Sequence, residues 1–299
     1  AGHNGMVGSA CWRALTSVGY TNLIGMTSKE LDLRNQQVVD DFIKTEKPDA
    51  IIGSAAKVGG ILANDTYPYE FLMDNMLIQN NLLRSAHEND IEKFIFLGSS
   101  CIYPKHSKQP LKEEYLLTGP LEPTNEWYAI AKISGVKLIE ALRKQYSRDY
   151  VSLMPTNLYG PNDNFDLENS HVLPAMIRKF HEAKQDNHSS VILWGSGSPL
   201  REFLHVDDLA QAVLFTLEHK LDDYLYNVGS GSDLTIKALA EMIQKVIGHN
   251  GQVLWDDSKP NGTPKKLMDS YKLNKLGWES SIELIDGIRA VSYTHLTLP

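Results

Sequence analysis

Two hydrophobic periods alternate along this chain of 299 residues. Short apolar runs of strand character occur at 21–26, 50–54, 92–98, 150–154, 191–194, 225–228 and 252–255. Apolar positions three or four residues apart predict helices at 6–18, 36–45, 69–89, 128–146, 171–184 and 235–247. A further helix should begin after the segment 201–208 and end near residue 219. Strands that alternate with helices indicate an α/β fold with a doubly wound parallel sheet.

The pattern loosens after residue 160, which predicts two parts. Residues 1–160 would form the large domain, to which part of the later chain returns, and residues 161–291 mainly a smaller α/β substrate-binding lobe. The helical period that starts near residue 282 breaks at Ser292, so we expect 292–299 to be disordered or non-native.

Charge and composition exclude several classes of protein. The net charge is −8 and the pI is near 5.7, which argues against nucleic acid as a partner. No apolar run approaches the length of a membrane span, and we expect no membrane partner and no metal site. Two cysteines do not make a disulfide framework, so a cytoplasmic location fits best.

A glycine-rich loop opens the chain, with glycines at Gly2, Gly5 and Gly8. Such glycines allow a tight turn and let backbone N–H groups and a helix N-terminus approach a pyrophosphate, as in a Rossmann-type domain. The loop normally follows a strand, yet the chain begins one residue before the first glycine. We therefore expect the first strand to be missing.

The residues after the predicted strand 21–26 bear on the choice between NAD and NADP. An acid usually follows this strand where NAD is bound, because it accepts from the ribose 2′-hydroxyl. Here Thr27, Ser28 and Lys29 follow instead. Ser28 and Lys29 suit a 2′-phosphate and favour NADP(H), although an ordinary polar loop would look the same.

Candidate catalytic groups lie near two predicted elements. Tyr128 and Lys132 are four apart on a helix, so they share one face. An adjacent ammonium should lower the pKa of the phenol and let Tyr128 exchange a proton near neutral pH. Ser99 and Cys101 follow the strand 92–98, at the sheet edge where α/β proteins bind ligands. The structural alternatives are a half-buried Tyr beside a solvated Lys, and a Cys that acts as a small buried hydrophobe.

Taken together, these motifs resemble the extended short-chain dehydrogenase/reductase family over residues 1 to about 290. Further matching stretches are Ala56–Ile61, Leu97–Pro104, Glu122–Glu126, Met154–Pro161, Asp163–Phe165, Ser170–Val172 and Trp194–Gly197. The resemblance implies a homodimer and the NADPH-dependent conversion of GDP-4-keto-6-deoxy-D-mannose to GDP-L-fucose, by 3,5-epimerisation and then 4-keto reduction.

The same resemblance assigns roles to five residues. Ser99 would hydrogen-bond the C4 carbonyl of the sugar, and Tyr128 would protonate that oxygen as hydride reaches C4. Lys132 would hold the nicotinamide ribose and keep Tyr128 acidic. Cys101 would be the base and His171 the acid for inversion at C3 and C5. Both have suitable chemistry, since a thiol ionises if its pKa is lowered and imidazole titrates near neutrality.

Binding residues are also implied by the resemblance. Those for the cofactor are Gly2, Gly5, Met6, Val7, Gly8, Ser28, Leu97, Gly98, Ser99, Ser100, Lys132, Pro155, Thr156, Asn157, Leu158 and His171. Those for the nucleotide sugar are Lys179, Trp194, Arg201 and Asp269. Lys179 departs from a frequent Arg, so it would neutralise phosphate without a bidentate contact. Asn4 replaces an Arg of some relatives, which removes one contact to a 2′-phosphate.

Two other readings stay open. A nucleotide-sugar 4-epimerase or 4,6-dehydratase of the same fold should lack the pair Cys101 and His171, and a dehydratase should carry a carboxylate beside Ser99. A non-catalytic dinucleotide-binding module should have lost Tyr128, Lys132 or Ser99. All of these groups are present, which favours the epimerase/reductase.

Overall fold

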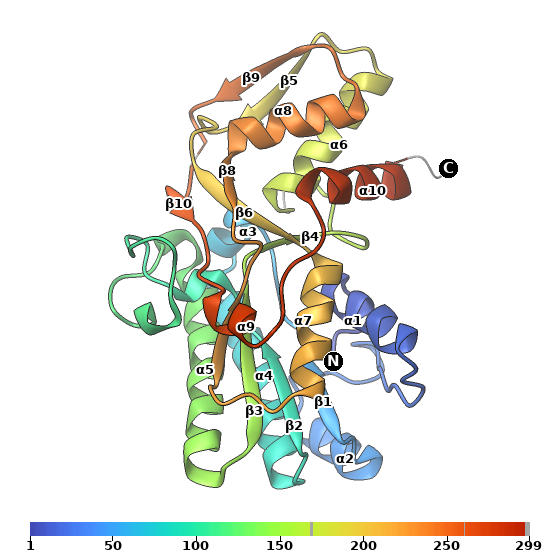
Figure 1. Ribbon diagram of the computed structural model, residues 1–299, viewed down its shortest axis with the longest axis vertical. Helices are drawn as coiled ribbons and strands as arrows, with labels where there is room; N and C mark the ends of the chain where they lie inside the picture. The colour runs from blue at the N-terminus through green and yellow to red at the C-terminus, as the bar shows by residue number, and fades with distance from the viewer. Residues whose placement is uncertain (168–169, 260, 297–299) are drawn as a thin grey trace.

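The structure is a computed structural model that describes residues 1–167, 170–259 and 261–296. Its centre is a four-stranded parallel sheet in the order β1-β2-β3-β7 (Figure 1). The strands are β1 (Ala50–Gly53), β2 (Lys93–Leu97), β3 (Asp149–Pro155) and β7 (Leu225–Val228). The predicted α/β class with a parallel sheet is confirmed.

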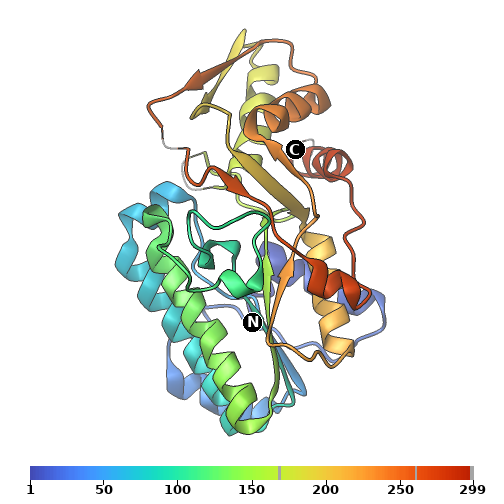
Figure 2. The same ribbon diagram turned by 60° about the vertical axis from the view of Figure 1, so that its left-hand side comes forward.

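Helices cover both faces of this sheet, and the alternating side chains of β2 contact both layers. Phe94 and Phe96 pack on α2 (Gln36–Glu46), α4 (Pro68–Glu88) and α5 (Glu126–Tyr146). Ile95 and Leu97 pack on α1 (Met6–Ser17) and α7 (Val206–Glu218), where Cys11 is a buried core residue. Because side chains alternate along a strand, a continuous apolar run fills two cores at once. Figure 2 shows helices on both sides of the sheet.

A second, smaller body holds a third core (Figure 1). One of its sheets has the order β10-β6-β4, with β8 antiparallel to β6, and β5 pairs with β9. The strands are β4 (Asn157–Tyr159), β5 (Ser190–Trp194), β6 (Leu200–His205), β8 (Asp233–Thr235), β9 (Gln252–Asp256) and β10 (Lys265–Lys266). The helices are α6 (Val172–Gln185), α8 (Ile236–Ile247) and α10 (Leu284–Leu296).

The chain crosses between the two bodies more than once. After β4 and β6 it returns through α7 and β7 to the large sheet, and then re-enters the smaller body at β8. Short helices α3 (Ile61–Thr66) and α9 (Tyr271–Lys275) and the 3-10 turns η1 (Ser100–Ile102), η2 (Glu113–Tyr115) and η3 (Pro123–Asn125) fill the connections. The domain division at residue 160 stays a prediction.

The strand predicted at 21–26 is wrong. Among the described residues, only Ala1 hydrogen-bonds to the outer edge of β1, through Ile52 and Ser54. The segment 21–26 pairs with none of the described strands, and its backbone forms no ladder. It packs instead on the start of the chain, where a Cβ on Gly25 would lie 2.6 Å from the His3 ring.

The predicted end of the last helix is also wrong. The helix α10 does not break at Ser292 but continues to Leu296. Ile288 and Val291 are buried in the third core and hold the helix in place. The helix therefore continues past Ser292 although the sequence there is polar. The rest of the predicted tail, 297–299, lies outside the described residues. No helix in the described ranges is long and apolar enough to cross a membrane.

Candidate active site

The glycine-rich loop leads into α1 at the carboxyl edge of the sheet. Gly5 caps α1 without a side-chain hydrogen bond, and the first turn, which includes Met6 and Val7, holds no acidic residue. A Cβ on Gly8 would lie 2.0 Å from the Gly2 oxygen, and Gly2 itself has φ +79°. Side chains are therefore excluded at Gly2 and Gly8. This backbone cradle, with the N-terminus of α1 beside it, fits a dinucleotide pyrophosphate.

The loop after α1 presents Ser28 to solvent. The Glu30 carboxylate, two residues later, accepts from the Thr27 backbone N–H and hydroxyl, both at 2.8 Å. These bonds lower the pKa of Glu30 and turn its carboxylate back on the loop. An acid is thus present one position after Lys29, but its carboxylate accepts hydrogen bonds from Thr27 within the turn. Ser28 and Lys29 remain exposed.

The end of β2 delivers the predicted cluster from Leu97 to Cys101. A Cβ on Gly98 would lie 2.0 Å from the Met154 methyl carbon, so only glycine lets β2 and β3 approach here. Ser99 caps η1, and its Oγ accepts from the Cys101 N–H at 3.4 Å. Because this bond uses Ser99 as an acceptor, its hydroxyl proton can still be donated to a substrate carbonyl.

Strand β3 ends in the predicted cofactor residues Pro155 to Leu158. The Thr156 N–H donates to Val228 at 3.0 Å, and the Thr156 hydroxyl and Asn157 amide donate to the Glu202 carbonyl. These bonds tie the large sheet to β6 of the smaller body. The junction of β3 and β4 is therefore held in place by hydrogen bonds that its own side chains donate to β6.

Tyr128 and Lys132 lie one turn apart on α5, as predicted. The Lys132 Nζ lies 5.7 Å from the centre of the Tyr128 ring and 4.8 Å from that of Phe96. It donates to the Leu97 carbonyl at 2.8 Å. Burial lowers the pKa of Lys132 to about 8, and only the nearby Cys101 opposes this.

The predicted fall in the pKa of Tyr128 is wrong for this structure. Burial raises the pKa of Tyr128, and Cys101 adds to the rise. The Lys132 ammonium is held by the Leu97 carbonyl and faces the ring, so its charge does not offset the desolvation of the phenol oxygen. A protonated Tyr128 is a proton donor at neutral pH, which suits the reducing direction.

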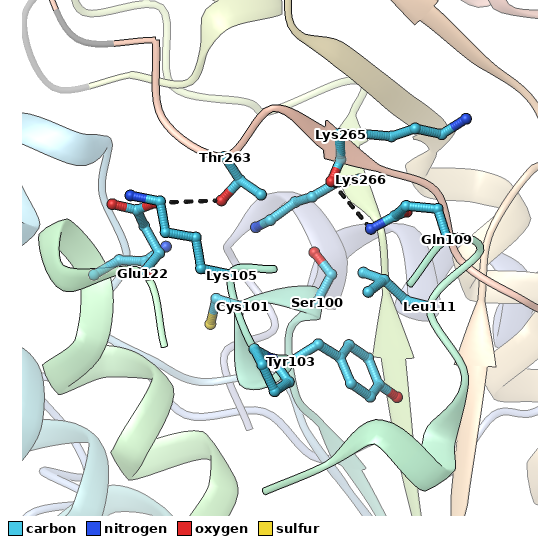
Figure 3. Close-up of a pocket in the computed structure, with 12 residues that line it drawn as sticks. Ser100, Cys101, Tyr103, Lys105, Gln109, Leu111, Glu122, Thr263, Lys265 and Lys266 are labelled. Atoms are coloured by element: carbon cyan, nitrogen blue, oxygen red, sulfur yellow. Dashed lines mark hydrogen bonds and ion pairs between the residues drawn. The ribbon is translucent and has the colours of Figure 1, made fainter. Parts of the chain in front are cut away.

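Cys101 is buried and lines a small pocket, of about 10 Å³, whose walls come from both bodies (Figure 3). Burial raises the pKa of its thiol, while the Lys266 and Lys132 ammonium groups act against the rise. His171 is the N-cap residue of α6 and makes no side-chain hydrogen bond to the helix. Desolvation by the surrounding chain, followed by the Lys266 charge, lowers the pKa of His171.

The same pocket contains polar groups that the sequence analysis did not assign. Glu122 pairs with Lys105 at 3.0 Å and accepts from the Thr263 hydroxyl at 3.5 Å. Lys266 enters from β10. Glu122 could have been predicted from the sequence, because it begins the matching stretch Glu122–Glu126. Lys266 could not, because no hydrophobic period marks the segment around it.

Three of the four predicted substrate residues lie on the smaller body. Trp194 ends β5 with 43% of its surface exposed, and the Lys179 Nζ lies 5.5 Å from its ring centre. Arg201 on β6 is desolvated, which lowers its pKa to about 10 although Glu122 opposes this. The hydrogen bonds of Asp269 lead elsewhere, to Tyr271, Leu111 and Asn227, so the structure does not join it to Trp194.

With this site in place, comparison with known proteins defines the class. The chain belongs to the NAD dependent epimerase/dehydratase family, whose model matches residues 1–229. Among curated proteins it is similar to GDP-L-fucose synthase 1 of Arabidopsis thaliana, with 56% identity over 96% of this chain and 89% of that protein. It is also similar to GDP-L-fucose synthase of Escherichia coli K12, with 52% identity over 96% of this chain and 92% of that protein.

A solved structure gives the same picture in three dimensions. The GDP-mannoheptose C4 reductase of Campylobacter jejuni, solved with NADP bound, is 37% identical and superimposes with a TM-score of 0.90. The match covers 97% of this chain and 95% of that one. The resemblance to the extended short-chain dehydrogenase/reductases is therefore confirmed.

Proposed function

We propose that this chain converts GDP-4-keto-6-deoxy-D-mannose to GDP-L-fucose with NADPH. The observation that carries the proposal is a reductase set beside Cys101 at the carboxyl edge of the large sheet, with His171 at the start of α6 within the influence of the same Lys266 charge that acts on Cys101. Ser99, Tyr128 and Lys132 form the reductase set, and Cys101 and His171 supply the acid/base pair. The high identity to two GDP-L-fucose synthases supports the choice of substrate.

NADP(H) is the cofactor that this site would hold. Gly2 and Gly8 leave room for its pyrophosphate against α1, and the exposed Ser28 and Lys29 suit its 2′-phosphate. When bound, it supplies the hydride that the residues of the chain cannot provide. The similar C4 reductase that was solved with NADP supports this choice over NAD.

Reduction at C4 requires a donor for the oxygen that gains charge. Ser99 donates a hydrogen bond to this oxygen, and Tyr128 transfers its proton to it. The raised pKa of Tyr128 keeps the phenol protonated until hydride arrives. Lys132, with its pKa near 8, carries an ammonium charge at neutral pH and would hold the nicotinamide ribose beside Tyr128.

Inversion at C3 and C5 requires a base and an acid on opposite faces of the sugar. The C4 ketone acidifies the hydrogens at both carbons. The Cys101 thiolate takes the proton and becomes a thiol, while the electron pair of the broken C–H bond moves to the C4 oxygen as an enolate. His171 then gives a proton to the same carbon from the other face, and the carbonyl re-forms.

Nucleotide binding falls to the smaller body in this proposal. Trp194 offers an exposed aromatic face to guanine, and Lys179 and Arg201 offer charge to the diphosphate. We also propose that Asp269 contributes a carboxylate, although its recorded bonds hold the start of α9.

The alternative is a nucleotide-sugar 4-epimerase or 4,6-dehydratase of the same fold. A dehydratase needs a carboxylate beside the Ser99 position, and Ser100 and Cys101 occupy it here. Neither alternative has a use for Cys101 and His171, which favours the epimerase/reductase.

We propose that two copies associate through α4 and α5. Tyr69, Met73 and Leu77 recur every fourth residue on α4 with 68%, 39% and 37% exposure. Trp127 and Ile130 lie exposed on the neighbouring α5. An apolar face of this kind suits burial against its own copy. A cytoplasmic location, which two unpaired cysteines fit, completes the proposal.

The direct experiment mixes the protein with GDP-4-keto-6-deoxy-D-mannose and NADPH. Loss of NADPH absorbance together with GDP-L-fucose formation is the expected result, and no NADPH oxidation would contradict the proposal. Tyr128→Phe should slow reduction by about 10²–10⁴ while deuterium from the solvent still exchanges at C3 and C5. Cys101→Ala should stop that exchange without loss of NADPH binding.

A further inference from the structure

Strand β10 places two adjacent lysines at the wall of the Cys101 pocket. It runs parallel to β6, with Lys266 opposite Arg201 in the register. Figure 3 shows the Lys265 and Lys266 side chains leaving the strand in opposite directions, as alternation requires. Lys265 turns away and pairs with Asp233 at 3.1 Å, whereas Lys266 points into the pocket.

The Lys266 ammonium is not neutralised there. Over the described ranges, no carboxylate lies within 4.0 Å of it and no hydrogen bond is recorded for it. Glu122, the carboxylate whose charge acts on Lys266, is already paired with Lys105 at 3.0 Å. Burial and Arg201 lower the pKa of Lys266, while Cys101 and Glu122 raise it. A desolvated cation without a fixed partner is typical of a functional site.

The same cation influences both residues of the proposed acid/base pair. After burial, Lys266 is the largest influence on the pKa of the Cys101 thiol and on that of the His171 imidazole. It favours thiolate at Cys101 and disfavours imidazolium at His171. Lys266 is therefore close enough to both to change their protonation.

We propose that Lys266 is a positioning residue for Cys101: held on β10 at the pocket wall, its unpaired ammonium stabilises the Cys101 thiolate that abstracts the sugar proton. The part of this inference that concerns proton abstraction rests on the proposed epimerisation. The part that concerns the thiolate stands on the structure alone.

The other groups that face Cys101 do not replace Lys266. From α5, Tyr128 is neutral and raised in pKa, and the Lys132 ammonium is bonded to the Leu97 carbonyl. On the pocket loops, Glu122 and Lys105 neutralise each other, and Ser99 is uncharged. Arg201 lies one strand further, opposite Lys266. Removal of Lys266 should therefore change the ionisation of Cys101 measurably.

The test measures the alkylation of Cys101 by iodoacetamide as a function of pH, read by peptide mass spectrometry. This readout separates Cys101 from the other cysteine, Cys11. Lys266→Met should raise the midpoint pH by about one unit, which corresponds to about tenfold slower alkylation below the midpoint. Lys266→Arg keeps the charge and should stay close to the wild type.

Lys265→Met is the matched control, because it removes the same charge from the same strand on the side away from the pocket. Equal midpoints for the wild type and Lys266→Met, or an equal shift in Lys265→Met, would overturn the proposal. The Lys266→Arg variant also guards against misfolding, since recovery of the midpoint by charge alone excludes a structural cause.

Activity provides the second readout. Deuterium exchange into the substrate should fall about tenfold in Lys266→Met at neutral pH, recover as pH rises, and leave KM unchanged. A higher KM with an unchanged exchange rate would instead assign Lys266 to substrate binding and overturn the inference. Because alkylation requires no turnover, a wild type without deuterium exchange would count against the proposed function, and an unshifted midpoint against the role of Lys266.

Discussion

Lys132 offers a prediction whose size follows from the structure. Its side chain is buried, with a residue exposure of 3%, and its pKa falls from 10.5 to about 8. Charge buried at this position therefore opposes folding. This fall in pKa corresponds to a loss of about 3 kcal/mol in the free energy of unfolding at pH 7, where the lysine is charged in both the folded and the unfolded chain.

The pH dependence has a definite sign. Between pH 8 and 10.5 the unfolded chain binds more protons at this lysine than the folded chain does, so folding stability rises with pH. By pH 9.5 the gain is about 2 kcal/mol relative to pH 7. Lys132→Met lacks this gain. Its lost hydrogen bond to Leu97 lowers stability by an amount that varies little over the range.

The assay compares urea unfolding of the wild type and Lys132→Met at pH 7 and pH 9.5. The free energy of unfolding of the wild type, relative to the variant, should rise by about 2 kcal/mol between these values. Lys144→Met, which removes an exposed lysine from the same helix, is the control. A difference between wild type and Lys132→Met that is the same at both pH values would refute the reasoning. The variant should also be inactive in reduction.

Three further predictions concern single side chains. Gly8→Ala should abolish NADPH binding, measured by the change in NADPH fluorescence, because its Cβ would lie 2.0 Å from the Gly2 oxygen. Gly5→Ala is the control: its Cβ would lie 3.5 Å from the same oxygen, so it should keep most of the affinity for NADPH. Trp194→Ala should weaken GDP binding about tenfold by calorimetry if stacking and the nearby lysines act there, and an unchanged Kd would exclude that role. Glu202→Leu should lower the free energy of unfolding by about 2–4 kcal/mol in urea, since the buried carboxylate accepts from the Gly231 and Met268 N–H groups; a loss below 1 kcal/mol would contradict this.

The sequence was most informative where one local period decides the outcome. The apolar run at 92–98 predicted β2, observed at Lys93–Leu97, and its alternation fills the cores on both faces of the sheet. The spacing of Tyr128 and Lys132 predicted a shared helix face, and the structure places their side chains together. Cys101 follows β2 at the sheet edge, as expected from the position of ligand sites in parallel sheets.

The errors have a common physical origin in partners that lie far along the chain. The segment 21–26 has the composition of a strand, but none of the described strands pairs with it. The pKa of Tyr128 depends on desolvation by distant segments, which outweighs the lysine one turn away. Strand β10 has two residues and exists only because β6 pairs with it, so Lys266 could not be assigned to the pocket from local pattern.

The central claim is that one chain performs two carbon inversions and one reduction. The measurement that tests it most directly is the number of deuterium atoms on carbon in the product formed from unlabelled substrate and NADPH in D₂O. The proposed mechanism predicts GDP-L-fucose with one deuterium at C3 and one at C5, because each inversion exchanges a carbon-bound proton with solvent, and none at C4. A reduced GDP-sugar without deuterium at C3 and C5 would contradict it and leave a simple C4 reductase.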